Sequence, residues 1–241
     1  MTKVVTLLSD LNPSTRDLLR LQAWLSPAFP TGGFSYSHGL EEAVMRGDLG
    51  TADGLFKWAE AAVSFGCGRV DAMLLVEAWR AVAAGEQERL FKVAEIGAAM
   101  RGTTELAIES VSQGEAFINT VQLAWPEVLM GSDIEKLRSS GINLALPVSV
   151  GIITASHEVS LEAVIPMYLQ SFGVGIVSAG VRLIPLGQTD GQRVTARLQP
   201  VVERASIAVL SASFEDIGGA APIIDLASMT HEVRNGRLFR S

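Results

Sequence analysis

Residues 160–183 decide the fold, and they read Ser160-Leu-Glu-Ala-Val-Ile-Pro-Met-Tyr-Leu-Gln-Ser-Phe-Gly-Val-Gly-Ile-Val-Ser-Ala-Gly-Val-Arg-Leu183. Charged side chains occur only near the two ends of this stretch, and apolar or small residues fill the remainder. A helix that is apolar on all sides is typical of the interior of a protein or of a membrane span. Together with the apolar run Pro147 to Ser156, this stretch is predicted to form the centre of a helical bundle.

A membrane span is the alternative for part of this stretch, because residues 163–181 contain no charged side chain over about the length that crosses a bilayer. The same residues include Pro166, Gln170 and several glycines and serines, which lower the hydrophobicity well below that of a leucine-rich span. Small residues also suit close helix packing in a soluble protein. The pattern favours a soluble bundle, with a small integral membrane helical protein as the alternative.

Helical periodicity and helix caps recur along the rest of the chain, whereas alternating β-branched runs are scarce. Ser14 with Asp17, Thr51, Thr103, and Thr189 with Gln192 are predicted helix starts. We therefore predict an all-α fold: a single-domain helical bundle of roughly ten helices over residues 1–241. A short N-terminal arm (residues 1–13) and a mobile C-terminal tail (about 229–241) are expected at the ends.

The composition limits the kinds of partner that the protein can have. Hydrophobic residues make up 48% of the 241 residues and charged residues 19%, so we expect apolar surface that a protein partner covers. The net charge is −7 and no basic block with interleaved aromatics occurs, which argues against nucleic acid. Cys67 is the only cysteine and the start lacks the features of a signal peptide, so a cytoplasmic protein without disulfides is expected.

Residues for catalysis or for metal binding are few. The three histidines and Cys67 show no metal-ligand spacing, and no phosphate-binding glycine-rich motif occurs, so no cofactor is expected. Ser35, Ser37 and His38 are near neighbours, but no nucleophile-elbow motif surrounds them. We expect no enzymatic activity, and a helical hydrolase that uses Ser37 and His38 is the alternative.

Three segments do not look like ordinary core. Residues 29–42 read Phe29-Pro-Thr-Gly-Gly-Phe-Ser-Tyr-Ser-His-Gly-Leu-Glu-Glu42, in which proline and glycine predict a sharp turn before Ser35 or Ser37 starts a helix. The turn is expected to present its two following aromatics, Phe34 and Tyr36, together with His38. The second segment is residues 181–193, and the third is the closing run 231–241, in which His231 is expected to contact a partner.

These segments, together with Arg101-Gly-Thr-Thr-Glu105, resemble the urease accessory protein family UreF over nearly the whole chain. The run Leu183-Ile-Pro-Leu-Gly-Gln-Thr-Asp-Gly-Gln192 is the most specific part of the resemblance. The resemblance implies an all-α homodimeric scaffold without catalytic activity. It also implies binding to UreD (also called UreH), to the nickel-carrying GTPase UreG and to apo-urease, and so a role in loading nickel into urease.

The resemblance also implies partner-binding residues. Phe34 and Arg237 occupy positions that imply contacts to the GTPase. The other implied positions share the same three segments: Tyr36, His38 and Glu41 in the first, Arg182, Gln188, Asp190 and Gln192 in the second, and His231 and Phe239 in the third. Structural roles are the alternative for the second segment, where Asp190 would serve the turn and Arg182 would pair with an acidic neighbour. Residues 233–236 depart from the family pattern, which has Thr-Gln-Tyr-Ser there.

Overall fold

The structure is a computed structural model that describes residues 13–125 and 132–240. All regular elements in these two ranges are helical, which confirms the prediction of an all-α fold. The α-helices are α2 (Thr15–Trp24), α3 (Leu40–Met45), α4 (Ala52–Ser64), α5 (Cys67–Ala84), α6 (Gln87–Ala99), α7 (Thr104–Ala124), α8 (Ser132–Ser139), α9 (Leu146–Ser156), α10 (Leu161–Leu183), α11 (Gln188–Leu210) and α12 (Pro222–Glu232). Two short 3-10 helices are η1 (Gly33–Ser35) and η2 (Phe214–Asp216).

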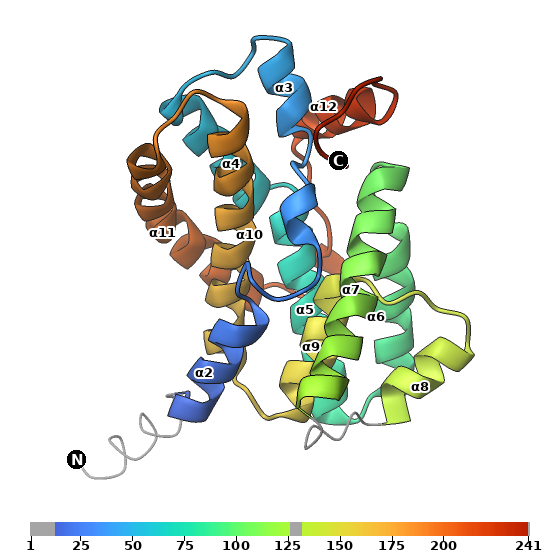
Figure 1. Cartoon of the computed structure of the whole chain (residues 1–241). Helices are drawn as coiled ribbons and strands as arrows, with labels where there is room; N and C mark the ends of the chain where they lie inside the picture. Colours follow the sequence, from blue (N-terminus) through green and yellow to red (C-terminus); the bar gives the residue numbers. More distant parts are fainter. Residues whose placement is uncertain (1–12, 126–131, 241) are drawn as a thin grey trace, which may run out of the picture.

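Helices α5, α9 and α10 form the centre of the bundle (Figure 1). Helix α5 packs most extensively against α9 and also contacts α4, α6, α10 and α11. Residues 147–155 of α9 are all buried, as the apolar run predicted. The backbones of α5 and α9 approach closely at Gly151, where an added Cβ would lie 2.6 Å from the carbonyl oxygen of Leu75.

The remaining helices lie on either side of this centre. Helices α4 and α11 pack against one another and against α10, whereas α6, α7 and α8 lie on the side of α9 (Figure 1). Helices α3 and α12 pack together at one end of the bundle. One hydrophobic core runs from Leu21 to Phe239, so segments near both ends of the chain contribute to it.

Among the described residues, helix α10 is the one that is long and apolar enough to cross a membrane. Its most apolar 18 residues have a mean hydropathy of 1.5. Half of these 18 residues are buried inside the protein, and α10 packs against α11, α4 and α5. A core helix of a soluble bundle can be equally long and equally apolar. The packing of α10 is therefore that of a core helix.

Several helix starts agree with the predicted caps. Ser14 and Asp17 form a capping box at α2, and the side chains of Thr51 and Thr103 cap α4 and α7. The prediction for the start of α11 was wrong, because this helix begins at Gln188, one residue before Thr189.

The C-terminal tail contacts residues that are distant in the sequence. In the structure α12 continues to Glu232, and distant residues contact Arg234 and residues 237–240. The mobility predicted for the tail from about residue 229 stays a prediction. Phe239 is only 3% exposed. Ion pairs and backbone hydrogen bonds join the tail to distant residues. Of the predicted N-terminal arm, only Pro13 lies in the described part of the chain.

Candidate functional site

The first of the three unusual segments forms a tight turn with one exposed ring. The chain reverses at Gly32, where φ is +78°, a conformation that glycine adopts without steric penalty. The 3-10 helix η1 follows, and Phe34 in its middle is 72% exposed. Tyr36 is buried. Phe34 is therefore the ring of this turn that a partner can reach.

Helix α3 begins later than the sequence predicted. It starts at Leu40 and not at Ser35 or Ser37, because His38 and Gly39 have φ values of +51° and +73°, which interrupt the helix. Ser37 still acts near the helix start, since its hydroxyl accepts a hydrogen bond from the N–H of the residue four positions later.

Helix α12 lies directly against this turn, although the two are far apart in sequence (Figure 1). The contact is closest at Gly39, where an added Cβ would lie 2.8 Å from the backbone nitrogen of Ser228. The start of α7 joins the contact, because the hydroxyls of Thr103 and Ser228 are 3.5 Å apart. Gly39 is therefore needed for two reasons: its φ is positive, and a side chain at this position would collide with α12.

A buried histidine connects the three helices. His231 of α12 is fully buried, and its Nε2 lies 3.0 Å from Oε2 of Glu41 in α3. Its Nδ1 lies 3.0 Å from Oε2 of Glu105 in α7. We call these three residues the His231 cluster. The sequence predicted a surface contact for His231, but the structure places it beneath the surface, between two carboxylates.

The tail continues from this cluster and wraps around the turn. The backbone N–H groups of Leu238 and Phe239 donate to the two carboxylate oxygens of Glu41, at 2.8 and 2.9 Å. The N–H of Arg240 donates to the carbonyl oxygen of Ser35 at 2.8 Å. The tail is therefore attached at both α3 and η1.

Two ion pairs also attach the tail. Arg237 pairs with Glu105, using the carboxylate oxygen that does not face the imidazole. Arg234 donates to Glu42 of α3 at 2.6 Å. Removing either arginine would leave a largely buried carboxylate without its cationic partner, which is costly.

The tail also changes the acidity of Glu41. Burial by itself raises the pKa of this carboxyl, but the hydrogen bonds from the Leu238 N–H, from His231 and from the Phe239 N–H outweigh burial and lower the pKa below its ordinary value. Glu41 is therefore ionised while the tail is in place.

Arg182 near the end of α10 joins the turn to the tail on the outer side. Its Nη2 donates to the carbonyl oxygen of Phe34 at 2.8 Å, and its guanidinium lies 4.5 Å from the ring centre of Phe239. Within residues 13–125 and 132–240 this arginine has no ion pair with an acidic neighbour; it bridges a carbonyl group and an aromatic face.

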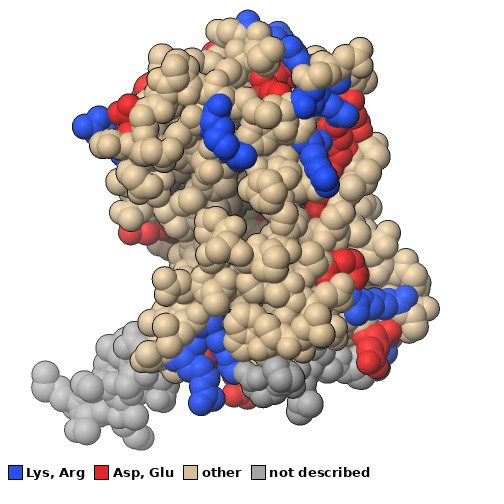
Figure 2. All heavy atoms as spheres, viewed as in Figure 1, with Lys and Arg blue, Asp and Glu red and all other residues tan. Residues whose placement is uncertain are grey.

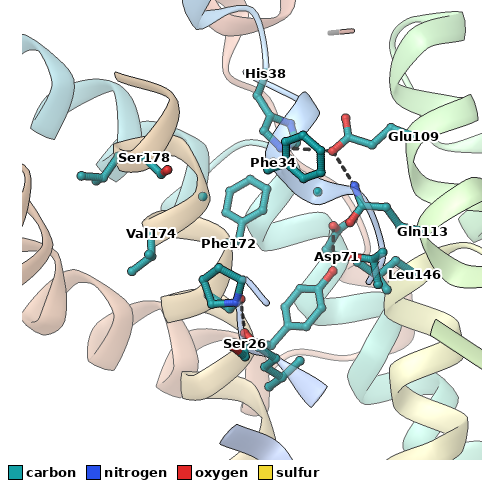
Figure 3. A pocket seen from close by; sticks show the side chains of 18 of the residues that line it. Ser26, Phe34, His38, Asp71, Glu109, Gln113, Leu146, Phe172, Val174 and Ser178 are labelled. Atoms are coloured by element: carbon teal, nitrogen blue, oxygen red, sulfur yellow. Dashed lines mark hydrogen bonds and ion pairs between the residues drawn. The ribbon is translucent and has the colours of Figure 1, made fainter. Parts of the chain in front are cut away.

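A cavity of about 530 Å³ lies behind Phe34, and Figure 2 shows a hollow bordered mainly by uncharged side chains in the middle of this face. Its size is within the range of ligand-binding pockets in proteins. Its walls come from η1, α7, α10 and the start of α11. Figure 3 shows Phe34, His38 and Phe172 close together in this cavity.

The deep part of the cavity contains a charged pair. Arg101 donates to Asp71 at 2.7 Å and to the hydroxyl of Ser110 at 2.8 Å. Tyr168 donates its hydroxyl to the other oxygen of Asp71 at 3.0 Å. Burial, followed by the nearby Asp71 charge, raises the pKa of the Tyr168 hydroxyl well above its ordinary value. The pair and its neighbours fix α5, α7 and α10 relative to one another.

His38 faces this polar group from the turn. Its Nε2 lies 3.5 Å from Oε1 of Glu109, which also accepts a hydrogen bond from Gln113 at 2.9 Å (Figure 3). Burial lowers the pKa of His38 to about 4, an effect that the nearby Asp71 only partly opposes. The imidazole is therefore neutral at physiological pH.

The three polar residues predicted at the start of α11 do not act as one group. Gln188 and Gln192 line the cavity, whereas Asp190 accepts a hydrogen bond from Arg193 at 2.9 Å on the exposed surface. The local ion pair of Asp190 agrees with a structural role at the helix start.

The structure therefore brings most of the predicted residues together but gives them different positions. Phe34, Arg182 and Arg237 lie at the surface, whereas Tyr36, Glu41, His231 and Phe239 are buried beneath it. The sequence pattern gives Glu105 no site role, although this residue ends the motif Arg101-Gly-Thr-Thr-Glu105. It also missed several polar residues that meet in the fold, namely Glu42, Asp71, Arg101, Glu109 and Gln113.

The arrangement offers little for catalysis or for metal binding. The described residues contain no group of three or more His, Cys, Asp or Glu side chains arranged to hold a metal ion. Ser37, the nucleophile of the hydrolase alternative, is fully buried and accepts the N–H of Glu41. A substrate in solution would not reach this hydroxyl.

Comparison with known proteins gives consistent matches. The model of the UreF family matches residues 49–199. "Urease accessory protein UreF" of Rhodopseudomonas palustris (strain BisA53) is 44% identical over 224 residues, which cover 93% of each chain. The protein of the same name from Granulibacter bethesdensis is 41% identical over 239 residues, which cover 98% of this chain and 100% of the relative. That from Bradyrhizobium sp. (strain BTAi1) is 43% identical over 93% of this chain and 92% of the relative.

Proposed function

The chain belongs to the UreF family of urease accessory proteins, and from this premise we propose that it is a scaffold without catalytic activity of its own. In this proposal the protein is a cytoplasmic homodimer that binds UreD (UreH) and the GTPase UreG. The assembly docks on apo-urease and supports the insertion of nickel into its active site.

The observation that carries the proposal is the joining of the turn and the tail into one surface. Hydrogen bonds from Leu238 and Phe239 to Glu41 connect residues that are almost 200 positions apart in the chain. The network beneath the surface is buried and ion-paired, so the surface is organised before a partner arrives. Preorganisation reduces the ordering that binding requires.

We assign UreG to this surface, with Phe34 and Arg237 as its main contacts. An exposed aromatic residue flanked by arginines has the composition of a binding hot spot. Phe34 is 72% exposed, and the side chain of Arg237 is 34% exposed although it pairs with Glu105. The ion pair with Glu105 fixes the position of Arg237, so we expect this arginine both to contact UreG and to hold the tail in the docking surface.

A second surface suits UreD. The outer face of α12 and the residue after it expose four large apolar side chains: Ile223, Leu226, Met229 and Val233, which are 76, 62, 48 and 81% exposed. Their spacing places them on the face opposite to the buried Ile224, Ala227, Ser228 and His231. A continuous apolar stripe of this kind marks a protein–protein interface. It also agrees with the apolar excess of the composition.

Co-purification of the tagged chain with UreD and UreG, with mass measured by light scattering, tests the proposal. We expect a stable stoichiometric complex, and a mass for the isolated chain of twice its monomer. Arg237→Ala should lose UreG while its circular dichroism spectrum stays helical. Arg193→Ala is the matched control, because Arg193 pairs with Asp190 on the exposed part of α11. Binding of neither partner by the unaltered chain would refute the scaffold function.

A further inference from the structure

The His231 cluster contains too few protons if its three groups have their usual charges. A neutral imidazole has one N–H, and a carboxylate can only accept hydrogen bonds. Yet both ring nitrogens lie 3.0 Å from a carboxylate oxygen, one of Glu41 and one of Glu105. Two hydrogen bonds need two protons, so the cluster holds one more proton than a neutral histidine between two carboxylates would.

We propose that the C-terminal tail is a proton-held latch, whose docking on the turn takes up one proton at the His231 cluster. Because Glu41 is ionised while the tail is in place, the proton is held either by the second ring nitrogen of His231 or by the carboxyl group of Glu105. In each case every short contact of the imidazole is a hydrogen bond. Loss of the proton would place a nitrogen lone pair against a carboxylate oxygen.

The groups around the cluster bind the two carboxylates, but none of them supplies a proton to a ring nitrogen of His231. The second oxygen of Glu105 is occupied by Arg237. Glu41 already accepts the N–H groups of Leu238 and Phe239. Other charged groups near the cluster in the described part of the chain include the pair Arg234 and Glu42, and Glu232 at the end of α12, whose backbone carbonyl faces Arg237. Docking of the tail therefore depends on the one proton between the imidazole and a carboxylate.

Burial makes this mismatch important. His231 is 0% exposed and the side chains of Glu41 and Glu105 are 5 and 12% exposed, so water can replace the missing hydrogen bond only poorly. Two of the three groups also hold the tail directly, Glu41 through backbone N–H groups and Glu105 through Arg237. Repulsion inside the cluster is thus relieved when the tail and α12 move away.

This latch deepens the proposed function, because it would make the UreG-docking surface form less readily as pH rises. That regulatory meaning rests on the proposed function. The coupling between protons and the tail does not, since it concerns contacts within the chain alone.

Amide hydrogen exchange on the isolated full-length chain tests the latch without any partner. The protection factors of the Leu238 and Phe239 amides would be measured from pH 6 to pH 10, with each rate divided by the intrinsic rate at the same pH. Linkage to one proton predicts that protection falls by up to about tenfold per pH unit between the midpoint of proton loss with the tail open and the midpoint with the tail docked, and is constant outside that window. Protection that stays constant over this whole range would overturn the proposal.

The variant Glu105→Gln separates the latch from a general effect of alkaline pH. Its amide nitrogen can donate to Nδ1 of a neutral His231, and its amide oxygen can still accept from Arg237. We therefore expect tail protection that no longer changes with pH. Glu42→Gln is the matched control, because Glu42 pairs with Arg234 and does not touch the imidazole, so the slope should remain.

The outcomes are distinct. A tenfold slope that Glu105→Gln abolishes and Glu42→Gln keeps would support the latch, and an unchanged slope in Glu105→Gln would overturn it. If Glu105→Gln leaves the tail unprotected at every pH, the other two proteins decide the test. A pH-dependent loss of protection in both the unaltered chain and Glu42→Gln would support the latch, and constant protection in the unaltered chain would overturn it. Failure to capture UreG with a normal slope would refute the docking function and leave the latch standing.

Discussion

Replacing Gly39 by alanine tests whether the contact between the turn and α12 holds the candidate surface together. An added Cβ would lie 2.8 Å from the backbone nitrogen of Ser228 and 3.1 Å from the carbonyl oxygen of Ile224. Both atoms belong to the α12 backbone and cannot rotate away as a side chain would. The methyl group therefore has to push α12 from the turn.

The expected loss has two parts. The φ of +73° at Gly39 costs about 1–2 kcal/mol for a residue with a Cβ, and alanine recovers up to about 1 kcal/mol by restricting the unfolded chain. The steric overlap adds about 1–3 kcal/mol, as for other overpacked sites. We expect a total loss of about 2–4 kcal/mol in the free energy of unfolding.

Gly47→Ala is the control for the backbone part alone. Gly47 has a φ of +80°, and an added Cβ would meet no atom within 4 Å. Urea denaturation of both variants should show a loss of about 1 kcal/mol for Gly47→Ala and a clearly larger loss for Gly39→Ala. Only Gly39→Ala should also increase proteolysis of the tail. Equal losses in the two variants, with equally protected tails, would refute the reasoning.

Four further expectations follow from other contacts. Phe34→Ala should leave the free energy of unfolding within about 0.5 kcal/mol of the unaltered chain, because the ring is exposed, yet it should reduce UreG capture in a pull-down. Arg101→Ala should lower the free energy of unfolding by about 3–5 kcal/mol in urea denaturation, because it leaves the charge of Asp71 buried without a partner. Cys67 should be unreactive toward a thiol reagent at pH 8 until the chain unfolds, because burial raises its pKa to about 12; rapid reaction of the folded protein would contradict this. The lowered pKa of Glu41 stabilises the fold above the ordinary glutamate pKa, and this contribution is lost as pH falls through the folded value, so Glu41→Gln should flatten the acid side of a stability profile between pH 6 and pH 3.

The helices and the core could be predicted from the sequence because their signals are local. Periodicity identified the buried α9 and α10, and the side chains of Ser14, Thr51 and Thr103 cap helices where the sequence predicted. Each of these features depends on residues within a few positions of one another. The resemblance to the UreF family, which the comparisons confirmed, likewise follows from the order of residues along the chain.

The candidate site could be predicted only in part. The sequence indicated the turn and the closing segment, and it singled out Phe34 and Arg237. It gave no means of separating surface residues from supporting ones, so the buried His231 and Phe239 were grouped with the exposed contacts. Glu105 was not assigned to the site, because a carboxylate in the first turn of a helix is an ordinary helix-start residue.

The sequence by itself determined that this protein is an all-α member of the UreF family with an unusual glycine turn. Only the tertiary structure decided that the tail closes on that turn, that His231 lies between Glu41 and Glu105, and that a cavity opens behind Phe34. The physical reason is distance along the chain. Helix signals arise between neighbours, whereas the charge balance of the buried cluster depends on segments that only folding brings together.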